Sequence, residues 1–477
     1  MTKRQKCAAA LTIDCFLEVV SAALEIGDIT IFSFQFQGGM HMSFSQKVKS
    51  TLWRIVDAMS CNIAPFVKNP QKDFTRNRKL GFVQLIRFLL CMESGCLSHE
   101  LLKYFYFNPD EAPTASAFIQ QRAKLLPKTF RHILRQFNLQ FPAKGFMGKY
   151  SLIAADGCEF NIAHNPDDPS TFHPSSGRSK KGFNSLHTIS LFDLFSKRYL
   201  DVVVQPGRKK NEFAALCQLI SRYPYAGNPI FVADRGFASY NVFAHAIKKG
   251  FYFVIRAKDI NTKRLLASDS LPDQFDRWAD IILTRSNSKK KRMHPHLATL
   301  YRYICKAVPF DFITDSCPEY HMRLRVVRFR IAEGTYENII TNLPDIEFKA
   351  EQIKYIYHLR WGVETSFRDL KHTLGTANFH SKSPEFIEFE ILCRMILYNF
   401  CTIITMEVPI EKKTAKWEYQ VNLSLAIKIC FAFLLDHVAP GNVNGLISQY
   451  ILPIRPDRTY ARQLRFQSPA SFAYRFV

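Results

Sequence analysis

The chain has 477 residues, enough for several domains built around a large hydrophobic core. Hydrophobic residues make up 47% and aromatic residues 14% of the sequence, which excludes an intrinsically disordered protein. The formal net charge of +23 favours a polyanionic partner such as nucleic acid, and no terminal basic amphipathic helix points to a membrane surface instead.

Neither a membrane span nor a secretory leader is expected. No run of about 18 apolar residues is uninterrupted, and the longest candidate, from Ile391, carries Arg394 and Asn399, as a buried core helix does. Asp14 and Glu18 break the apolar run near the N-terminus, unlike in a signal peptide. The 12 cysteines are scattered without a CxxC motif, which argues against structural zinc and favours a reducing cytoplasm.

Helices are predicted for the N-terminal part of the chain. Residues 1–41 differ in composition from the rest of the chain, and we interpret them as an N-terminal extension without a role in the fold. Residues 42–148 carry apolar residues at helical spacing, and Thr114 or Ser116 is a suitable N-cap. Basic residues recur here, so we predict a helical DNA-binding domain; a helical domain without DNA contacts is the alternative.

From residue 149 the pattern changes to short strands separated by helices. Helices are predicted over 212–222 and 239–249, and Asp156 and Asp234 are expected to end the first and fourth strands. The order β-β-β-α-β-α-β over 149–259 indicates an α/β fold, a mixed sheet flanked by helices. The five predicted strands are SLIAAD, GFNSLHTISLF, RYLDVVVQ, PIFVAD and FYFVIRAK.

The remaining sequence divides into three parts. Residues 260–345 contain short alternating runs and a basic run at 289–292, and we predict a β-rich insertion. Residues 346–410 are predicted to form the second part of the core, and residues 411–477 a C-terminal helical region with a basic tail. The tail carries Arg455, Arg458, Arg462, Arg465 and Arg475.

The second part of the core begins with a distinctive helical pattern over residues 357–371. Tyr357, Arg360, Glu364 and Lys371 fall within a stripe roughly 60° wide on an α-helix. An acidic side chain is thereby held at the edge of a core beside basic and phenolic groups, a pattern suited to metal and phosphate chemistry. The alternative is an amphipathic surface helix with ordinary ion pairs, each worth a few tenths of a kcal/mol. The neighbouring apolar stripe is Ile356, Leu359, Val363, Phe367, Leu370 and Leu374.

Three carboxylates are predicted to meet in one crevice. If the first and fourth strands lie side by side, Asp156 and Asp234 project beyond their carboxyl ends, and Glu364 joins them from the helix. Such carboxylates repel one another unless a cation compensates, and hard oxygen ligands suit Mg²⁺ or Mn²⁺. Two such ions would serve an in-line phosphoryl displacement.

These motifs resemble those of the DDE transposases on a ribonuclease-H-like core, and in particular the insertion-sequence-four family of bacterial transposases. The motifs are IAADG around Asp156, VADRGF around Asp234, and Tyr-x2-Arg-x3-Glu-x6-Lys from Tyr357 to Lys371. The resemblance covers about residues 110–405. It implies that Asp156, Asp234 and Glu364 are catalytic and bind the metals.

The same resemblance implies that Tyr357, Arg360 and Lys371 contact DNA near the cleaved end. It further implies cut-and-paste transposition, often through a hairpin at the transposon end, on terminal inverted repeats and target DNA. A homodimer is implied in the synaptic complex, and a cytoplasmic, nucleoid-associated location in a bacterium. A ribonuclease-H-like nuclease without strand transfer, or a catalytically inactive DNA-binding relative, are the alternatives.

Several other polar and aromatic residues are candidates of lower rank. Arg235 follows Asp234 directly, and we expect it either to contact DNA or to stabilise the turn. A solvated or capping role is expected for three further acids, and core packing rather than base stacking for two tryptophans. These residues are Asp193, Asp201, Glu212, Trp278 and Trp361.

Overall fold

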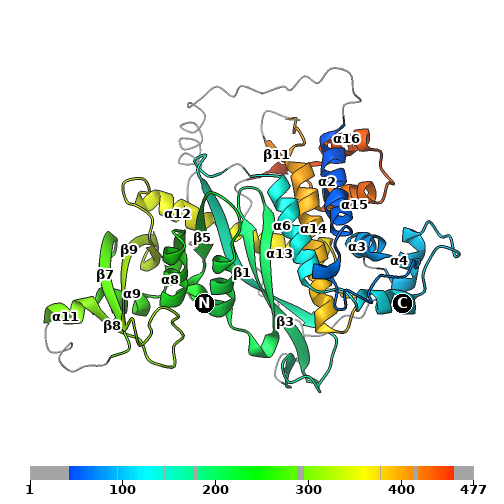
Figure 1. The fold of residues 1–477 in the computed structure, drawn as a ribbon. Coiled ribbons are helices and arrows are strands. Elements are labelled where there is room, and N and C mark those ends of the chain that lie inside the picture. The colour runs from blue at the N-terminus through cyan, green and yellow to red at the C-terminus, as the bar shows by residue number, and fades with distance from the viewer. Residues whose placement is uncertain are drawn as a thin grey trace.

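The computed structural model describes residues 42–455 apart from 94, 144, 176–179, 287–294, 377 and 412–416. The predicted extension over 1–41, the basic run at 289–292 and the tail arginines beyond Arg455 lie outside the described residues. One ten-stranded sheet crosses the molecule, with the N-terminal helices beside one end of it and the inserted strands forming its other end (Figure 1).

The N-terminal part is helical, as predicted. Ser43 caps the first helix by accepting a hydrogen bond from the N–H of Gln46, and Thr114 caps another by accepting from Ala117. The prediction of Thr114 as an N-cap is therefore confirmed. The helices are α2 (Phe44–Met59), η1 (Ala64–Phe66), α3 (Phe82–Cys91), α4 (Leu97–Tyr104), α5 (Ala115–Arg122) and α6 (Lys128–Gln140).

The predicted strand and helix order of the core is confirmed, with one addition, the short strand β2. Strands β4, β3, β1, β5 and β6 follow one another across the sheet, with β1 antiparallel to β3 and parallel to β5. This is the ribonuclease-H-like mixed sheet that the resemblance implied. The elements are β1 (Tyr150–Ile162), β2 (Phe172–His173), β3 (Phe183–Asp193), β4 (Arg198–Pro206), η2 (Gly207–Lys209), α7 (Glu212–Ser221), β5 (Asn228–Ala233), η3 (Arg235–Phe237), α8 (Tyr240–Lys248) and β6 (Tyr252–Ala257).

Strand β1 is buried on both faces, because helices cover the sheet from both sides. Ala154 and Cys158 belong to the core that includes α13 (Trp361–Arg368) and α14 (Pro384–Met406), whereas Ile153 and Ala155 belong to the core that includes α7 and α8. The alternation of a strand thus sends even-numbered side chains of β1, including Asp156, toward the α13 face.

The inserted segment is β-rich, as predicted, but it continues the core sheet. Strand β10 pairs antiparallel with β6, from Asn338 opposite Ala257 to Thr341 opposite Val254. Local patterning could not reveal this, since the two strands are joined through the whole insertion. The elements are α9 (Asp259–Leu266), β7 (Phe275–Thr284), α11 (Pro295–Leu300), β8 (Tyr301–Tyr303), β9 (Glu319–Ala332) and β10 (Thr335–Thr341).

The single helix expected over 357–371 is wrong in detail, because three helical segments follow one another there. They are α12 (Ala350–Leu359), α13 (Trp361–Arg368) and the π-helical turn η4 (Asp369–Thr373). At Arg360 the backbone stays helical, with φ −50° and ψ −33°, but its N–H bonds the carbonyl three residues back, at Tyr357. The π-helical turn η4 then holds one more residue per hydrogen-bonded turn than an α-helix does, before the helical region ends.

The predicted apolar stripe of this region is buried, except that Leu359 is half-buried. The helix phase inferred from the sequence is therefore confirmed through α13. Buried members of the stripe are Ile356, Val363, Phe367, Leu370 and Leu374.

Helix α14 (Pro384–Met406) is the core helix predicted around Ile391. It is the one described helix long and apolar enough to cross a membrane, and 94% of its most apolar window is buried inside the protein. The C-terminal part adds β11 (Glu418–Val421), α15 (Leu423–Leu434), η5 (Pro440–Asn442), α16 (Val443–Gln449) and β12 (Ile451–Ile454).

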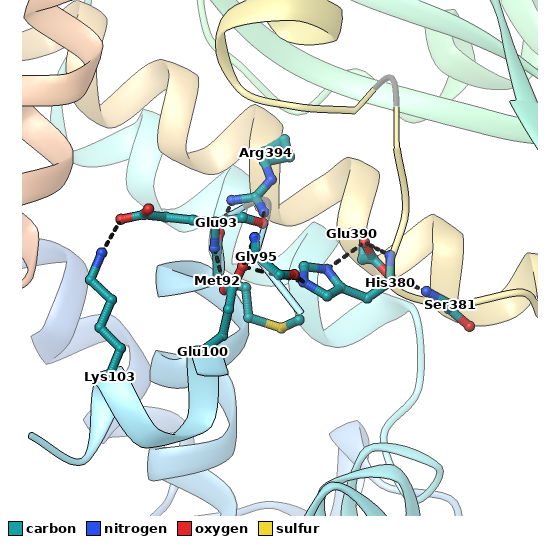
Figure 2. Close-up of polar contacts among 9 residues, drawn as sticks. All are labelled: Met92, Glu93, Gly95, Glu100, Lys103, His380, Ser381, Glu390 and Arg394. Carbon is teal, nitrogen blue, oxygen red and sulfur yellow. Dashed lines mark hydrogen bonds and ion pairs between the residues drawn. The ribbon is translucent and has the colours of Figure 1, made fainter. Parts of the chain in front are cut away.

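A buried charge cluster joins the turn between α3 and α4 to the start of α14 (Figure 2). The imidazole of His380 lies between two carboxylates, with Nε2 3.4 Å from Glu100 Oε1 and Nδ1 3.3 Å from Glu390 Oε2. The His380 side chain is 4% exposed and those of Glu100 and Glu390 are 5% and 6% exposed, so water cannot screen these charges.

Main-chain groups complete this cluster. Glu100 accepts a hydrogen bond from the N–H of Gly95 at 2.6 Å, and Glu390 accepts one from Ser381 at 2.9 Å. Arg394 donates to the carbonyl of Glu93 at 2.9 Å. The helical N-terminal part is thus fixed by charge to the segment that follows η4.

Candidate active site

Asp156 and Asp234 lie on neighbouring parallel strands at the same level. The register pairs Ala155 of β1 with Ala233 of β5, and each aspartate is the next residue. The predicted adjacency of the two strands is therefore confirmed. The prediction that Asp156 ends its strand is wrong, because β1 continues to Ile162 through pairing with β3 alone.

Arg360 connects Asp156 to Glu364. Its guanidinium donates to Asp156 Oδ2 at 3.2 Å and to Glu364 Oε1 at 3.1 Å. Arg360 is 4% exposed and packs over the ring of Trp361, with its guanidinium carbon 4.8 Å from the ring centroid. One buried cation therefore gathers a carboxylate from the sheet and one from α13.

Tyr357 and Arg256 contact the other aspartate. The hydroxyl of Tyr357 donates to Asp234 Oδ1 at 3.1 Å, and Arg256 of β6 lies 3.9 Å from the same oxygen. Arg256 also lies 3.4 Å from Glu337 Oε1 of β10. Three adjoining strands and α12 thus contribute to the surroundings of Asp234.

Arg256 and Glu337 were not identified from the sequence. Arg256 interrupts an otherwise apolar buried strand, FYFVIRA, which is a sign of a functional or paired charge. Ala233 pairs with Ile255, so Arg256 stands level with Asp234. Glu337 gave no comparable sign, because only the pairing of β10 with β6 brings it close.

The three predicted carboxylates are close enough to affect one another electrostatically. Burial raises the pKa of Asp156 to about 6; the charges of Glu364 and Asp234 add to the rise, and the Gly157 N–H and Arg360 oppose it. The side chains of Asp156, Asp234 and Glu364 are 20%, 38% and 45% exposed, so the site opens to solvent.

The donor set suits a hard divalent cation. Carboxylate oxygens are the ligands Mg²⁺ and Mn²⁺ prefer. Burial is the main cause of the raised pKa of Asp156, and the charges of Glu364 and Asp234 add to it, as neighbouring metal-binding carboxylates do. Across the described part of the chain, no three acidic, histidine or cysteine side chains are gathered closely enough to hold a metal as they stand. At present the guanidinium of Arg360 supplies the positive charge between Asp156 and Glu364.

Lys371 and Arg235 lie near the carboxylates but form no ion pair with them among the residues that the structure describes. Lys371, in η4, is half-buried with its Nζ 5.3 Å from the ring centroid of Phe160, which shares the face of β1 with Asp156. Arg235 is exposed in the turn η3, directly after Asp234.

The acids of lower rank have structural partners, and only Asp193 takes the capping role that was expected. Asp193 accepts hydrogen bonds from two N–H groups of its own turn, and Asp201 pairs with both ends of the Arg222 fork at 2.7 and 2.9 Å. Glu212 lies 3.0 Å from His187 Nε2 at the start of α7.

The expectation of core packing is wrong for Trp361, which is 55% exposed. It lies on the side of α13 away from Val363 and Phe367, against Arg360. Trp278 is half-buried, donates from Nε1 to Asp345 at 3.3 Å and lies under the guanidinium of Arg323.

Comparison with known proteins agrees with this geometry. The family model described as the transposase DDE domain matches residues 147–400, just over half of the chain, and includes all three carboxylates. The transposase for insertion sequence element IS421 of Escherichia coli is 26% identical over 192 residues, covering 37% of this chain and 51% of that protein. The transposase InsG for insertion sequence element IS4 of Escherichia coli (strain K12) is 23% identical over 145 residues, covering 28% of this chain and 33% of that protein.

The chain thus spans about half the length, or less, of these relatives. Among solved structures, the piggyBac transposase synaptic complex with hairpin DNA aligns with 88% of this chain and 85% of that chain, at 10% identity and a TM-score of 0.38, too weak a likeness to bear on mechanism. The family model settles the membership that the motifs indicated: the chain belongs to the transposase DDE domain family.

Proposed function

We propose that this protein is a metal-dependent DNA transposase, which cleaves the ends of its element and transfers them into target DNA. The observation that carries the proposal is that Asp156 of the sheet and Glu364 of α13 share one buried arginine, Arg360, while Asp234 follows the neighbouring parallel strand level with Asp156. Membership of the transposase DDE domain family supports it.

Asp156, Asp234 and Glu364 would hold two Mg²⁺ or Mn²⁺ ions. Such ions, when bound, stabilise the attacking and leaving oxygens of a phosphodiester. The chain's own groups bind and orient the DNA: Arg360 can grip a phosphate with both amino groups once it leaves the carboxylates, and Tyr357 can donate a hydrogen bond.

Lys371 and Arg235 complete the proposed phosphate contacts. Lys371 presents a point charge beside β1, and Arg235 presents an exposed fork next to Asp234. Replacing Lys371 by Ala is expected to weaken both DNA binding and cleavage, since the charge serves the bound strand rather than the metals.

The partners follow from the same proposal. With a net charge of +23, the protein binds the terminal inverted repeats through its helices in 42–148 and receives target DNA at the site. Cutting both ends together requires a homodimer in the synaptic complex, and release through hairpin ends is the proposed route. The site of action is the bacterial cytoplasm, at the nucleoid.

A strand-transfer assay tests the proposal. A pre-cut duplex carrying the inverted repeats that flank the gene is incubated with target DNA and Mg²⁺, and joined products are measured. Asp156→Asn, Asp234→Asn and Glu364→Gln should abolish joining while retaining end binding. Glu351→Gln, an exposed acid in the first turn of α12, is the matched control and should join normally.

The outcomes separate the alternatives. Cleavage without joined products in the unmodified protein would leave a nuclease, and end binding without either reaction would leave a DNA-binding relative. Loss of end binding in the well-folded carboxylate variants would contradict the metal role.

A further inference from the structure

A cavity of about 500 Å³ lies away from the carboxylates, between α6 and the loop that joins α7 to β5. Its polar lining comes from one face of α6 and from the edge of the core sheet. The apolar part of the lining includes Phe66, Leu200 and Tyr225. The polar lining residues are Lys128, Arg131, His132, Arg135, Asp201 and Arg222.

The positive charge of this cavity is only partly compensated. Arg222 pairs with Asp201, and Arg131 with Glu388. Lys128 and Arg135 are both exposed, and neither side chain forms a hydrogen bond or ion pair with any residue that the structure describes. Two cations of α6 thus face the cavity without a partner.

The two unpaired cations stand on the same side of their helix. Residues i and i+7 are two turns apart, so Lys128 and Arg135 are separated by roughly 10 Å along the axis of α6. His132 lies between them, and burial together with the charge of Arg135 holds the pKa of His132 below its usual value. The charge of Arg135 thus acts on His132 within the cavity lining.

The cavity also has a defined position relative to the carboxylates. Asp201 of β4 pairs with Leu191 of β3, which pairs with Ala155 of β1, the residue before Asp156. The edge strand that lines the cavity is therefore level with Asp156, two strands away, a backbone offset of roughly 10 Å.

We propose that this cavity binds the phosphodiester backbone of duplex DNA, with Lys128 and Arg135 each contacting a phosphate. The proposal rests on the proposed function, in that DNA is the substrate. Contacts to phosphates fix the position of a duplex without reading its sequence, so the cavity holds DNA against the edge of the sheet while the carboxylates act elsewhere.

Salt dependence of DNA binding tests this inference. The affinity for a labelled duplex of generic sequence is measured by fluorescence anisotropy over a range of salt concentrations. In Lys128→Gln/Arg135→Gln, the slope of log K against log [salt] should become shallower by about 2, because two phosphate contacts and their counterion release are lost. Both positions are exposed, and thermal unfolding of the variant checks that folding is unchanged.

A matched control removes the same charge elsewhere. Lys248 and Lys249 are exposed at the end of α8, away from the cavity lining. Lys248→Gln/Lys249→Gln should keep the original slope. An equal loss of slope in both double variants would show a general effect of net charge and overturn the inference.

Inorganic phosphate distinguishes DNA from a small anion. Calorimetric titration of the unmodified protein with phosphate should show only weak binding. If phosphate instead bound tightly, and Lys128→Gln/Arg135→Gln lost that binding while its salt slope for DNA stayed unchanged, the DNA assignment would be overturned. Strand transfer by the carboxylate variants reports on the proposed function separately. An unchanged salt slope of DNA binding in Lys128→Gln/Arg135→Gln would therefore reject DNA binding at the cavity and would leave the transposase proposal intact.

Discussion

Arg360 donates a hydrogen bond to Asp156 at 3.2 Å, across 204 positions of the sequence. Because its other amino group reaches Glu364 at 3.1 Å, this one side chain bridges two of the three carboxylates. A divalent cation bound to the same oxygens competes with the guanidinium. Under the proposed function, metal binding would therefore be linked to release of Arg360, and the released arginine would become available to a phosphate.

Arg360→Gln should strengthen divalent cation binding in the absence of DNA. The reason is that the competing charge is removed while the carboxylates remain. Added Mn²⁺ or Mg²⁺ should raise the melting temperature of this variant more than that of the unmodified protein, as a ligand specific to the folded state does. The control is Arg368→Gln, an exposed arginine of α13, 3.9 Å from Asp369. Equal metal-induced shifts in all three proteins would contradict competition.

Asp156→Asn should abolish strand transfer yet stabilise the metal-free protein above neutral pH. The folded pKa of Asp156 is about 6 against an ordinary value of 3.8, so ionising this buried carboxyl opposes folding. The stability that protonated Asp156 contributes is fully present below the pKa of this group in the unfolded chain, and it is lost as pH rises through about 6. The gain in the variant should be about 1–3 kcal/mol at pH 8 and should disappear near pH 4. Denaturant unfolding at both pH values measures it, and a loss of stability at pH 8 would count against the assignment.

Arg256→Gln should lower strand transfer by about 10- to 100-fold, the usual range for groups that orient a metal ligand. Arg256 lies between Asp234 and Glu337, and without it these two acids face each other uncompensated. Arg256→Lys retains the charge and should recover part of the rate. If Gln and Lys variants were equally impaired, the loss would reflect the fork geometry of arginine rather than its charge.

Glu100→Gln should destabilise the protein by about 2–4 kcal/mol at neutral pH, because His380 and the N–H groups around it lose a buried carboxylate partner. Burial alone would raise the pKa of Glu100, but the hydrogen bond and charge of His380 bring the pKa below its usual value. The stability that ionised Glu100 contributes is present above the pKa of this group in the unfolded chain, and it is lost as pH falls through the lower pKa of Glu100 in the folded protein.

The difference between Glu100→Gln and the unmodified protein should therefore shrink in acid. Thermal unfolding across a pH series measures it, with the exposed Glu111→Gln as control. A constant difference at every pH would mean that packing rather than ionisation is responsible.

The sequence was sufficient for the features that depend on local periodicity. Alternation located the strands of Asp156 and Asp234, and the apolar stripe fixed the helix phase of Glu364. The same projection also places Trp361 opposite the stripe, so its exposure could have been derived.

Features that depend on strand pairing could not be predicted. Whether β1 continues past Asp156 is decided by its partner β3, which no local pattern encodes. The approach of Glu337 to Arg256 likewise follows from the pairing of β10 with β6.

The pairing of β10 with β6 has a mechanical consequence. Strands β9 and β10 are hydrogen-bonded through β6 to β5, the strand that ends just before Asp234, so the inserted segment cannot swing as a hinged flap. A displacement of the inserted strands would therefore pass through the continuous hydrogen-bonded ladder to β5, whose last residue precedes Asp234.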